Sequence, residues 1–153
     1  MVNGSLWEGE RMEIARSFRE LNTYKLCREA AKAIFAVTRK FPSEERFALT
    51  DQIRRSSRAV NAMIAEAWAK RRYRASFINK IDDALGEANE TQAWLDHALD
   101  ANYIISVQFQ TLDAQWQSIG GKLSRMIDRA DDFCKNAPDT DYRIQNFHRG
   151  DAR

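Results

Sequence analysis

Apolar and small residues recur in alternating steps of three and four along four successive segments of the chain. This spacing places them on one face of an α-helix, and an amphipathic helix can bury that face only against neighbouring helices. The third segment keeps the spacing most regularly. We therefore predict an all-α fold, an antiparallel up-down-up-down four-helix bundle with short connections. The predicted core positions of the third helix are Phe77, Ile81, Ala84, Ala88, Thr91, Leu95 and Ala98.

The ends of the other three helices follow from their flanking residues. The first helix should run from about residue 22 to residue 40, because Pro42 disfavours helix at the residue before it. Ser43, followed by two glutamates, offers an N-cap for the second helix, which should end near Arg71. Ser106 can cap the fourth helix. The predicted stripes are Tyr24, Cys27, Ala31, Ile34, Thr38 and Phe41 in the first helix, Leu49, Ile53, Ser56, Val60, Met63 and Ala67 in the second, and Phe109, Leu112, Trp116, Ile119, Leu123, Met126, Ala130 and Phe133 in the fourth.

The length and composition of the chain suit one helical domain. The 153 residues include only two prolines and six glycines, which favours helices over sheets and leaves enough chain for one core. We place the bundle at residues 17–135. Residues 1–16 and 136–153 lack an apolar stripe, so we expect them to form flexible N-terminal and C-terminal tails.

Few side chains suited to catalysis or metal binding occur in the predicted bundle. Cys27 and Cys134 lie far apart in the sequence and have no histidine nearby to complete a metal site. The only histidine of the bundle, His97, has no acid three residues before it, as a two-metal carboxylate site would require. We therefore expect a protein that is not an enzyme and that uses no cofactor or metal.

No segment of the sequence resembles a membrane or secretion signal. A membrane helix needs about 20 apolar residues in succession, and no stretch approaches this length. The first residues also lack a charged region followed by an apolar one. We expect a cytoplasmic protein without membrane contact.

Charge is unevenly distributed, although the net charge is only +2. Residues 52 to 80 contain eight basic side chains and one acid, Glu66, whereas residues 82 to 100 contain six acids and no Lys or Arg. Basic side chains next to rings such as Trp68 and Tyr73 can contact phosphates and stack on unpaired bases. We therefore predict that this basic run binds nucleic acid. The predicted binding residues are Arg54, Arg55, Arg58, Lys70, Arg71, Arg72 and Arg74.

A role in protein contacts alone explains the same charges. The basic run could pair with the acids that follow it, within the chain or across a subunit contact. Glu66 stands four residues before Lys70, the favourable order for a helix pair, and Glu87 and Glu90 could meet arginines of the second helix. Two tryptophans flank their stripes and could extend the apolar surface beyond what one bundle covers. The residues expected at an oligomer interface are Trp68, Tyr73, Trp94, Glu66 and Glu90.

Several short motifs are shared with a known family. They are Phe41-Pro42 with Glu45, LTDQIRR at residues 49–55, IAE at residues 64–66, ETQAWL at residues 90–95 and NYI at residues 102–104. From about residue 18 to residue 127 the chain resembles the bacterial four-helix bundle proteins first noticed as products of intervening sequences in large-subunit ribosomal RNA genes. It differs from many members at Met63 and Ala67, where they have asparagine and glycine.

The resemblance implies a bundle that assembles as a homopentamer. A similar bundle is the accessory variability determinant of diversity-generating retroelements, a basic pentameric barrel that binds reverse transcriptase and nucleic acid. We therefore expect a non-enzymatic homo-oligomer whose basic surface binds nucleic acid, structured RNA first, or a nucleic-acid-processing enzyme such as a reverse transcriptase. The alternative is a protein-only oligomeric scaffold that binds no nucleic acid.

Overall fold

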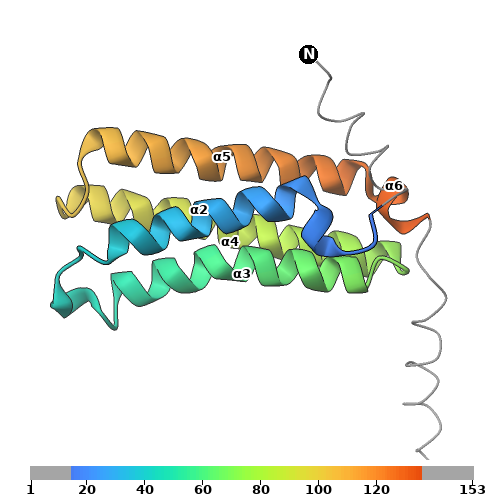
Figure 1. The fold of residues 1–153 in the computed structure, drawn as a ribbon, viewed down its shortest axis with the longest axis horizontal. Helices are drawn as coiled ribbons and strands as arrows, with labels where there is room; N and C mark the ends of the chain where they lie inside the picture. The colour runs from blue at the N-terminus through green and yellow to red at the C-terminus, as the bar shows by residue number, and fades with distance from the viewer. Residues whose placement is uncertain (1–14, 136–153) are drawn as a thin grey trace, which may run out of the picture.

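The computed structural model describes residues 15–135 and places four long helices side by side in a bundle (Figure 1). Short connections join successive helices, which therefore run antiparallel as predicted. The elements in chain order are η1 (Phe18–Glu20), α2 (Asn22–Thr38), η2 (Ser43–Glu45), α3 (Leu49–Ala69), α4 (Arg74–Asp100), α5 (Ser106–Asp128) and α6 (Ala130–Cys134), where η denotes a 3-10 helix.

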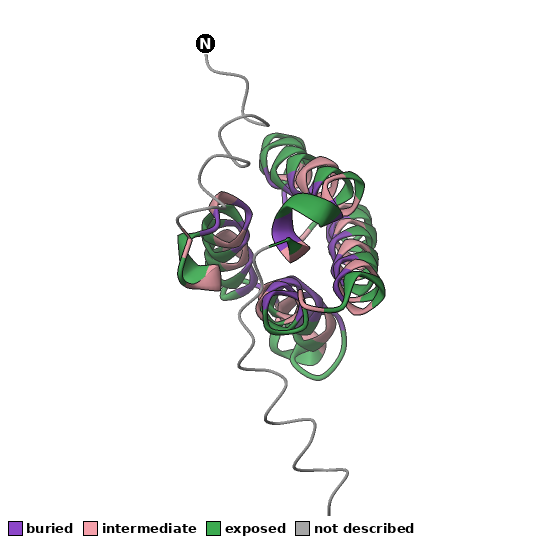
Figure 2. Ribbon diagram, turned by 90° about the vertical axis from the view of Figure 1, so that its right-hand side faces the viewer, coloured by how far each residue is buried: buried purple, intermediate pink, exposed green. Residues whose placement is uncertain are grey.

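One apolar core runs between the four long helices, whose buried sides face inward (Figure 2). All seven core positions predicted for α4 are buried, and Trp116 of α5 is fully buried as well. The stripe of α2 differs from the prediction at two positions, since Tyr24 and Ala31 are only half-buried while Thr23 and Ala30 are buried. The helix α4 packs along both α3 and α5, whereas α2 packs along α3 and contacts α5 less.

Two hydroxyl groups meet inside this core. Ser56 of α3 and Thr91 of α4 are both fully buried, and their side-chain oxygens lie 2.8 Å apart. Each hydroxyl also lies within hydrogen-bond distance of a carbonyl of its own helix, that of Ile53 or of Glu87. Because a hydroxyl has one hydrogen, one of the two donates to the other hydroxyl, which in turn donates to the carbonyl of its own helix. The polar atoms are therefore satisfied without water, and the bond links α3 to α4 at a defined register.

The start of the second long helix differs from the prediction. Ser43 begins the 3-10 turn η2, and α3 starts only at Leu49. The backbone N–H of Leu49 donates to a side-chain oxygen of Glu45 at 3.0 Å, while the hydroxyl of Tyr103 donates to the other oxygen of Glu45, also at 3.0 Å. A carboxylate of the turn thus replaces the predicted serine cap and also ties this turn to the α4–α5 connection.

The two ends of the α4–α5 connection are capped locally. Asn102 has a left-handed backbone with a φ of 59°, and the N–H of Tyr103 bonds back to the carbonyl of Ala98 at 2.9 Å. This arrangement satisfies the last carbonyls of α4. Ser106 is the first residue of α5 rather than its cap, because Ile105 occupies the N-cap position. The side chain of Gln108 accepts a hydrogen bond from the N–H of Ile105 at 3.0 Å.

Most of both predicted tails lies outside the described residues, namely residues 1–14 and 136–153. Ala15, which we had assigned to the N-terminal tail, packs against the core. No helix within residues 15–135 combines the length and the apolar character needed to cross a membrane.

Candidate nucleic-acid interface

The predicted basic residues lie on α3 and on the α3–α4 turn, but they point in three directions. Successive residues of an α-helix are about 100° apart, so neighbours in sequence face different sides. Arg54 and Arg58 are four residues apart and both reach Phe35 of α2, whereas Arg55 reaches α4. Lys70 and the arginines after it lie at the other end of α3. The basic run is therefore not one continuous surface.

Arg55 is held within the chain by two carboxylates of α4. Its Nη1 donates to both oxygens of Glu87 at 3.1 and 3.2 Å, and its Nη2 contacts Glu90. The prediction that these glutamates meet an arginine of the second helix is confirmed. The hydrogen bonds that Arg55 donates to Glu87 and Glu90 raise the pKa of Arg55 above its ordinary value. Arg55 thus links α3 to α4 and has its donors occupied.

Glu90 belongs to the same network. The indole Nε1 of Trp94 donates to its carboxylate at 3.1 Å, so this half-buried ring also has a partner within the monomer. Burial acts to raise the pKa of Glu90, but the hydrogen bonds from Arg55 and Trp94 outweigh it and hold the pKa below its ordinary value. Glu66 pairs with Lys80 of α4 at 3.0 Å, rather than with Lys70 as predicted.

The basic residues of the α3–α4 turn are also engaged locally. The guanidinium of Arg71 lies 3.8 Å from the centre of the Trp68 ring and donates to the Trp68 carbonyl at 2.7 Å. Trp68 is only 8% exposed, so the expectation that its ring extends the exposed apolar surface is wrong. Arg74 pairs with Asp131 of α6 at 2.6 Å. Arg72 lies beside the ring of Tyr73.

Arg54 and Arg58 have a different environment. Arg54 Nε donates to the hydroxyl of Thr38 at 2.8 Å, and this hydroxyl in turn donates to the carbonyl of Phe35 at 3.1 Å. The two guanidinium carbons lie 4.7 and 5.4 Å from the centre of the Phe35 ring. Within residues 15–135 no carboxylate lies within ion-pair distance of either arginine. Their charges therefore remain available.

The exposed side of α2 extends this basic surface, which our reading of the sequence missed. Arg28, Lys32 and Arg39 are exposed and are separated from Phe35 by seven, three and four residues, so they share its side of the helix. Two acids of the described residues share these helix sides. Glu29 lies 3.5 Å from Lys32 with both side chains largely exposed, and exposed Asp51 precedes Arg54 by three residues on α3. We call the surface formed by these residues the α2–α3 strip. It consists of Arg28, Lys32, Phe35, Arg39, Arg54 and Arg58.

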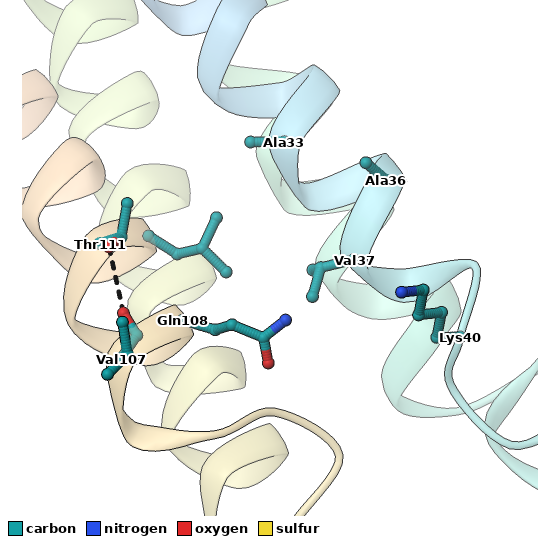
Figure 3. Close-up of a pocket in the computed structure, with 8 residues that line it drawn as sticks. Ala33, Ala36, Val37, Lys40, Val107, Gln108 and Thr111 are labelled. Carbon is teal, nitrogen blue, oxygen red and sulfur yellow. Dashed lines mark hydrogen bonds between the residues drawn. The ribbon is translucent and has the colours of Figure 1, made fainter.

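The side of α2 that faces α5 is apolar. A groove of about 450 Å³ lies between the end of α2 and the start of α5 (Figure 3). Ala33 and Val37 line one wall, and Val107, which is 68% exposed, lies on the other with Thr111. Gln108 extends across the gap toward Val37. No described element covers this groove. It lies where α2 contacts α5 less closely than α2 contacts α3.

A second groove, of about 550 Å³, lies between the start of α3 and the end of α4. Trp94 and His97 line it, with their ring centres 5.7 Å apart. His97 is exposed and lies on the helix surface. Among residues 15–135 no three His, Cys, Asp or Glu side chains gather in a way that could hold a metal ion.

Comparison with known proteins identifies this bundle. A solved structure from Bacteroides thetaiotaomicron VPI-5482, described as a protein with unknown function from the S23 ribosomal protein family, is 32% identical and superposes with a TM-score of 0.63. The similarity covers 69% of this chain and 97% of that one. A search of curated proteins finds no match. The family model described as 23S rRNA-intervening sequence protein matches residues 19–125, which span α2 to α5 and the α2–α3 strip. The chain therefore belongs to the 23S rRNA-intervening sequence protein family.

Proposed function

We propose that this protein is a non-enzymatic homo-oligomer that binds nucleic acid, structured RNA first, through the α2–α3 strip. The observation that carries the proposal is the pair of guanidinium groups on Arg54 and Arg58, which meet no carboxylate of residues 15–135 and lie beside exposed cations of α2. Arginines without a carboxylate partner are groups that contact phosphates, and here Arg54 is half-buried and Arg58 exposed. A nucleic-acid-processing enzyme such as a reverse transcriptase would meet the protein on the same surface.

Of the seven predicted binding residues, Arg54 and Arg58 form the centre of the proposed interface. Arg55 supports the bundle, because its donors are held by Glu87 and Glu90. The residues Lys70, Arg71, Arg72 and Arg74 lie at the other end of α3 and would add contacts only for a ligand long enough to reach them.

Salt dependence tests the nucleic-acid contact. If the five cations of the strip each neutralise one phosphate of a single strand, log K should fall with log salt with a slope of about −3.5, roughly a hundredfold between 50 and 200 mM. Fluorescence anisotropy with labelled RNA and DNA measures this slope. The double variant Arg54→Gln/Arg58→Gln should reduce it to about −2.

A matched double variant controls for the loss of charge. Arg125 and Lys135 are exposed and lie on α5 and just after α6, outside the strip. Replacing both with glutamine should leave the slope of the wild-type protein unchanged. The proposal fails if the wild-type protein binds neither RNA nor DNA, if binding is insensitive to salt, or if both double variants behave alike.

The oligomeric part of the proposal, a pentamer as the family resemblance implies, rests on the apolar side of the molecule. Val107 and Ile105 are 68% and 66% exposed beside the α2–α5 groove, which an adjacent copy would cover. Light scattering after size exclusion gives the mass in solution. We expect Val107→Asp to lower it, and Ala93→Asp, at an exposed position of α4, to leave it unchanged. A monomeric wild-type protein would contradict this proposal.

The second candidate is a protein-only scaffold, favoured by the exposed acids of α4. Asp82, Asp96 and Asp100 make no ion pair with any described residue and could receive the strip of an adjacent copy. Charge reversal separates the two functions. If Arg54→Glu/Arg58→Glu yields monomers, the strip serves assembly, and if the oligomer persists while nucleic-acid binding is lost, the strip serves binding.

A further inference from the structure

Phe35 is an exposed aromatic ring that the bundle does not use for its core. Its residue is 40% exposed, and it is not among the side chains that form the core or pack against it. The guanidinium groups of Arg54 and Arg58 lie close to its ring. A single exposed ring is common on protein surfaces. Here, however, the ring lies beside two guanidinium groups that have no carboxylate partner within residues 15–135, so an aromatic surface and phosphate-binding groups occur side by side.

The groups around the ring are held in place before any ligand binds. The bond from Arg54 Nε to Thr38 uses one donor of the guanidinium and fixes its orientation. Thr38 is buried and bonded to the carbonyl of Phe35, so ring, hydroxyl and guanidinium form one connected unit. The two terminal nitrogens of Arg54 donate to no residue in the range 15–135 and can donate to a phosphate in the bidentate manner of arginine.

Cations continue along α2 on both sides of the ring. Arg28 and Lys32 precede it and Arg39 follows it, a span of about 16 Å at the helical rise of 1.5 Å per residue. A chain of phosphates could follow this line while one base leaves the chain and stacks on the ring. Single-stranded nucleic acids are bound in this way, by a positive track with an aromatic platform.

We infer that Phe35, with Arg54 and Arg58, forms a stacking site for an unpaired base, so that the strip binds single-stranded or looped nucleotides in preference to a duplex. This inference rests on the proposed function and specifies its ligand. In a duplex both faces of every base are covered by neighbouring bases, so the ring gains no contact there. Structured RNA would meet the site through its loops and bulges.

The test compares single-stranded and duplex oligonucleotides of the same sequence with the full chain. Fluorescence anisotropy at a single low salt concentration should give a single-stranded affinity about tenfold higher than the duplex affinity, the order expected for one stacked base. RNA and DNA versions of the single strand identify the source of the nucleotide. A tighter RNA complex assigns it to RNA, and equal affinities assign the site to both.

Phe35→Leu keeps an apolar side chain but removes the aromatic face. We expect it to lose about tenfold in affinity for the single strand and to bind the duplex as before, while Phe35→Trp retains the preference. The matched control is Phe47→Leu, because Phe47 is 84% exposed and Arg46 lies 5.1 Å from its ring centre, outside the strip. Circular dichroism verifies that all variants are folded.

The outcomes separate the inference from the proposed function. If the wild-type protein binds single strands and duplexes equally, or if Phe35→Leu weakens both to the same extent, the strip binds phosphates only and the stacking site is refuted while the proposed function stands. The same holds if Phe47→Leu matches Phe35→Leu. If neither oligonucleotide binds the wild-type protein, the proposed function itself fails.

Discussion

Replacing Arg55 with glutamine should destabilise the bundle, whereas the same change at Arg58 should not. Arg55 bridges Glu87 and Glu90, whose side chains are 17% and 35% exposed, and its own is 45% exposed. An exposed ion pair contributes about 0.2–1 kcal/mol, and here two partly buried carboxylates, three residues apart on α4, would lose their shared donor. We expect Arg55→Gln to lower the free energy of unfolding by about 1–2 kcal/mol.

The loss should depend on pH. Hydrogen bonds from Arg55 and Trp94 hold the pKa of Glu90 below its ordinary value of 4.5, although burial acts to raise it. A carboxylate whose pKa is lowered by folding stabilises the fold above the unfolded pKa, and this contribution is lost as the pH falls through the folded pKa. The difference between wild type and Arg55→Gln should therefore be full at pH 7 and shrink below pH 4.5.

Urea unfolding followed by circular dichroism at pH 7, 5, 4 and 3.5 measures both effects. At pH 7 the expected loss corresponds to a decrease of about 2–8 °C in melting temperature for a chain of this size. Arg58→Gln serves as the control, because Arg58 lies on the same helix without a carboxylate partner among the described residues, and it should change stability by less than about 0.5 kcal/mol. Equal urea midpoints for Arg55→Gln and Arg58→Gln at pH 7 would refute the stabilising role of Arg55. A loss of stability in Arg55→Gln that is as large at pH 3.5 as at pH 7 would refute it too.

Three further predictions concern the core and its thiols. Thr91→Val should lower the free energy of unfolding by about 1–2 kcal/mol because it leaves the buried Ser56 hydroxyl with one partner fewer. In a double-mutant cycle, the double variant with Ser56→Ala should lose less stability than the sum of the two single variants, and additive losses would contradict the shared hydrogen bond. Ala88→Leu should cost about 1–3 kcal/mol in urea unfolding, because Ala88 is fully buried, whereas Ala93→Leu at an exposed position of the same helix should be nearly neutral. Burial raises the pKa of Cys27 to about 12, so at pH 8 only about one Cys27 thiol in ten thousand is ionised. A disulfide reagent should therefore label half-buried Cys134 first and Cys27 only on unfolding. Rapid labelling of both cysteines in the folded protein would contradict this.

The sequence predicted the fold well where packing is local and periodic. Every core position of α4 was correct, because each follows from the 3.6-residue repeat alone. The start of α3 could not be predicted in this way. It is set by Glu45, which caps Leu49 and is itself held by Tyr103, 58 residues further along the chain. A contact between distant turns leaves no trace in the local pattern that favoured Ser43.

The site was predicted less well, because a count of charges along the chain ignores direction. Arg54 and Arg55 are adjacent in the sequence, yet one contacts α2 and the other is neutralised by α4. The cations of α2 were missed because they are spread over twelve residues rather than clustered. Their spacing around Phe35 follows the same steps of three and four that identified the core, and the pattern applied to charged residues would have located the strip.

The pairing of charges inside the bundle determines where positive charge remains outside it. Glu66, Glu87 and Glu90 neutralise the cations that lie between α3 and α4, namely Arg55 and Lys80. Because α2 and α4 both pack on α3 and α5, they occupy opposite corners, and the carboxylates of α4 do not reach the outer side of α2. The basic face on α2 and the acidic face on α4 could serve assembly as well as nucleic-acid binding. Phe35 favours nucleic-acid binding, since a partner's carboxylates would gain nothing from the aromatic ring beside the arginines, whereas a nucleotide offers a phosphate to the arginines and a flat base to the ring.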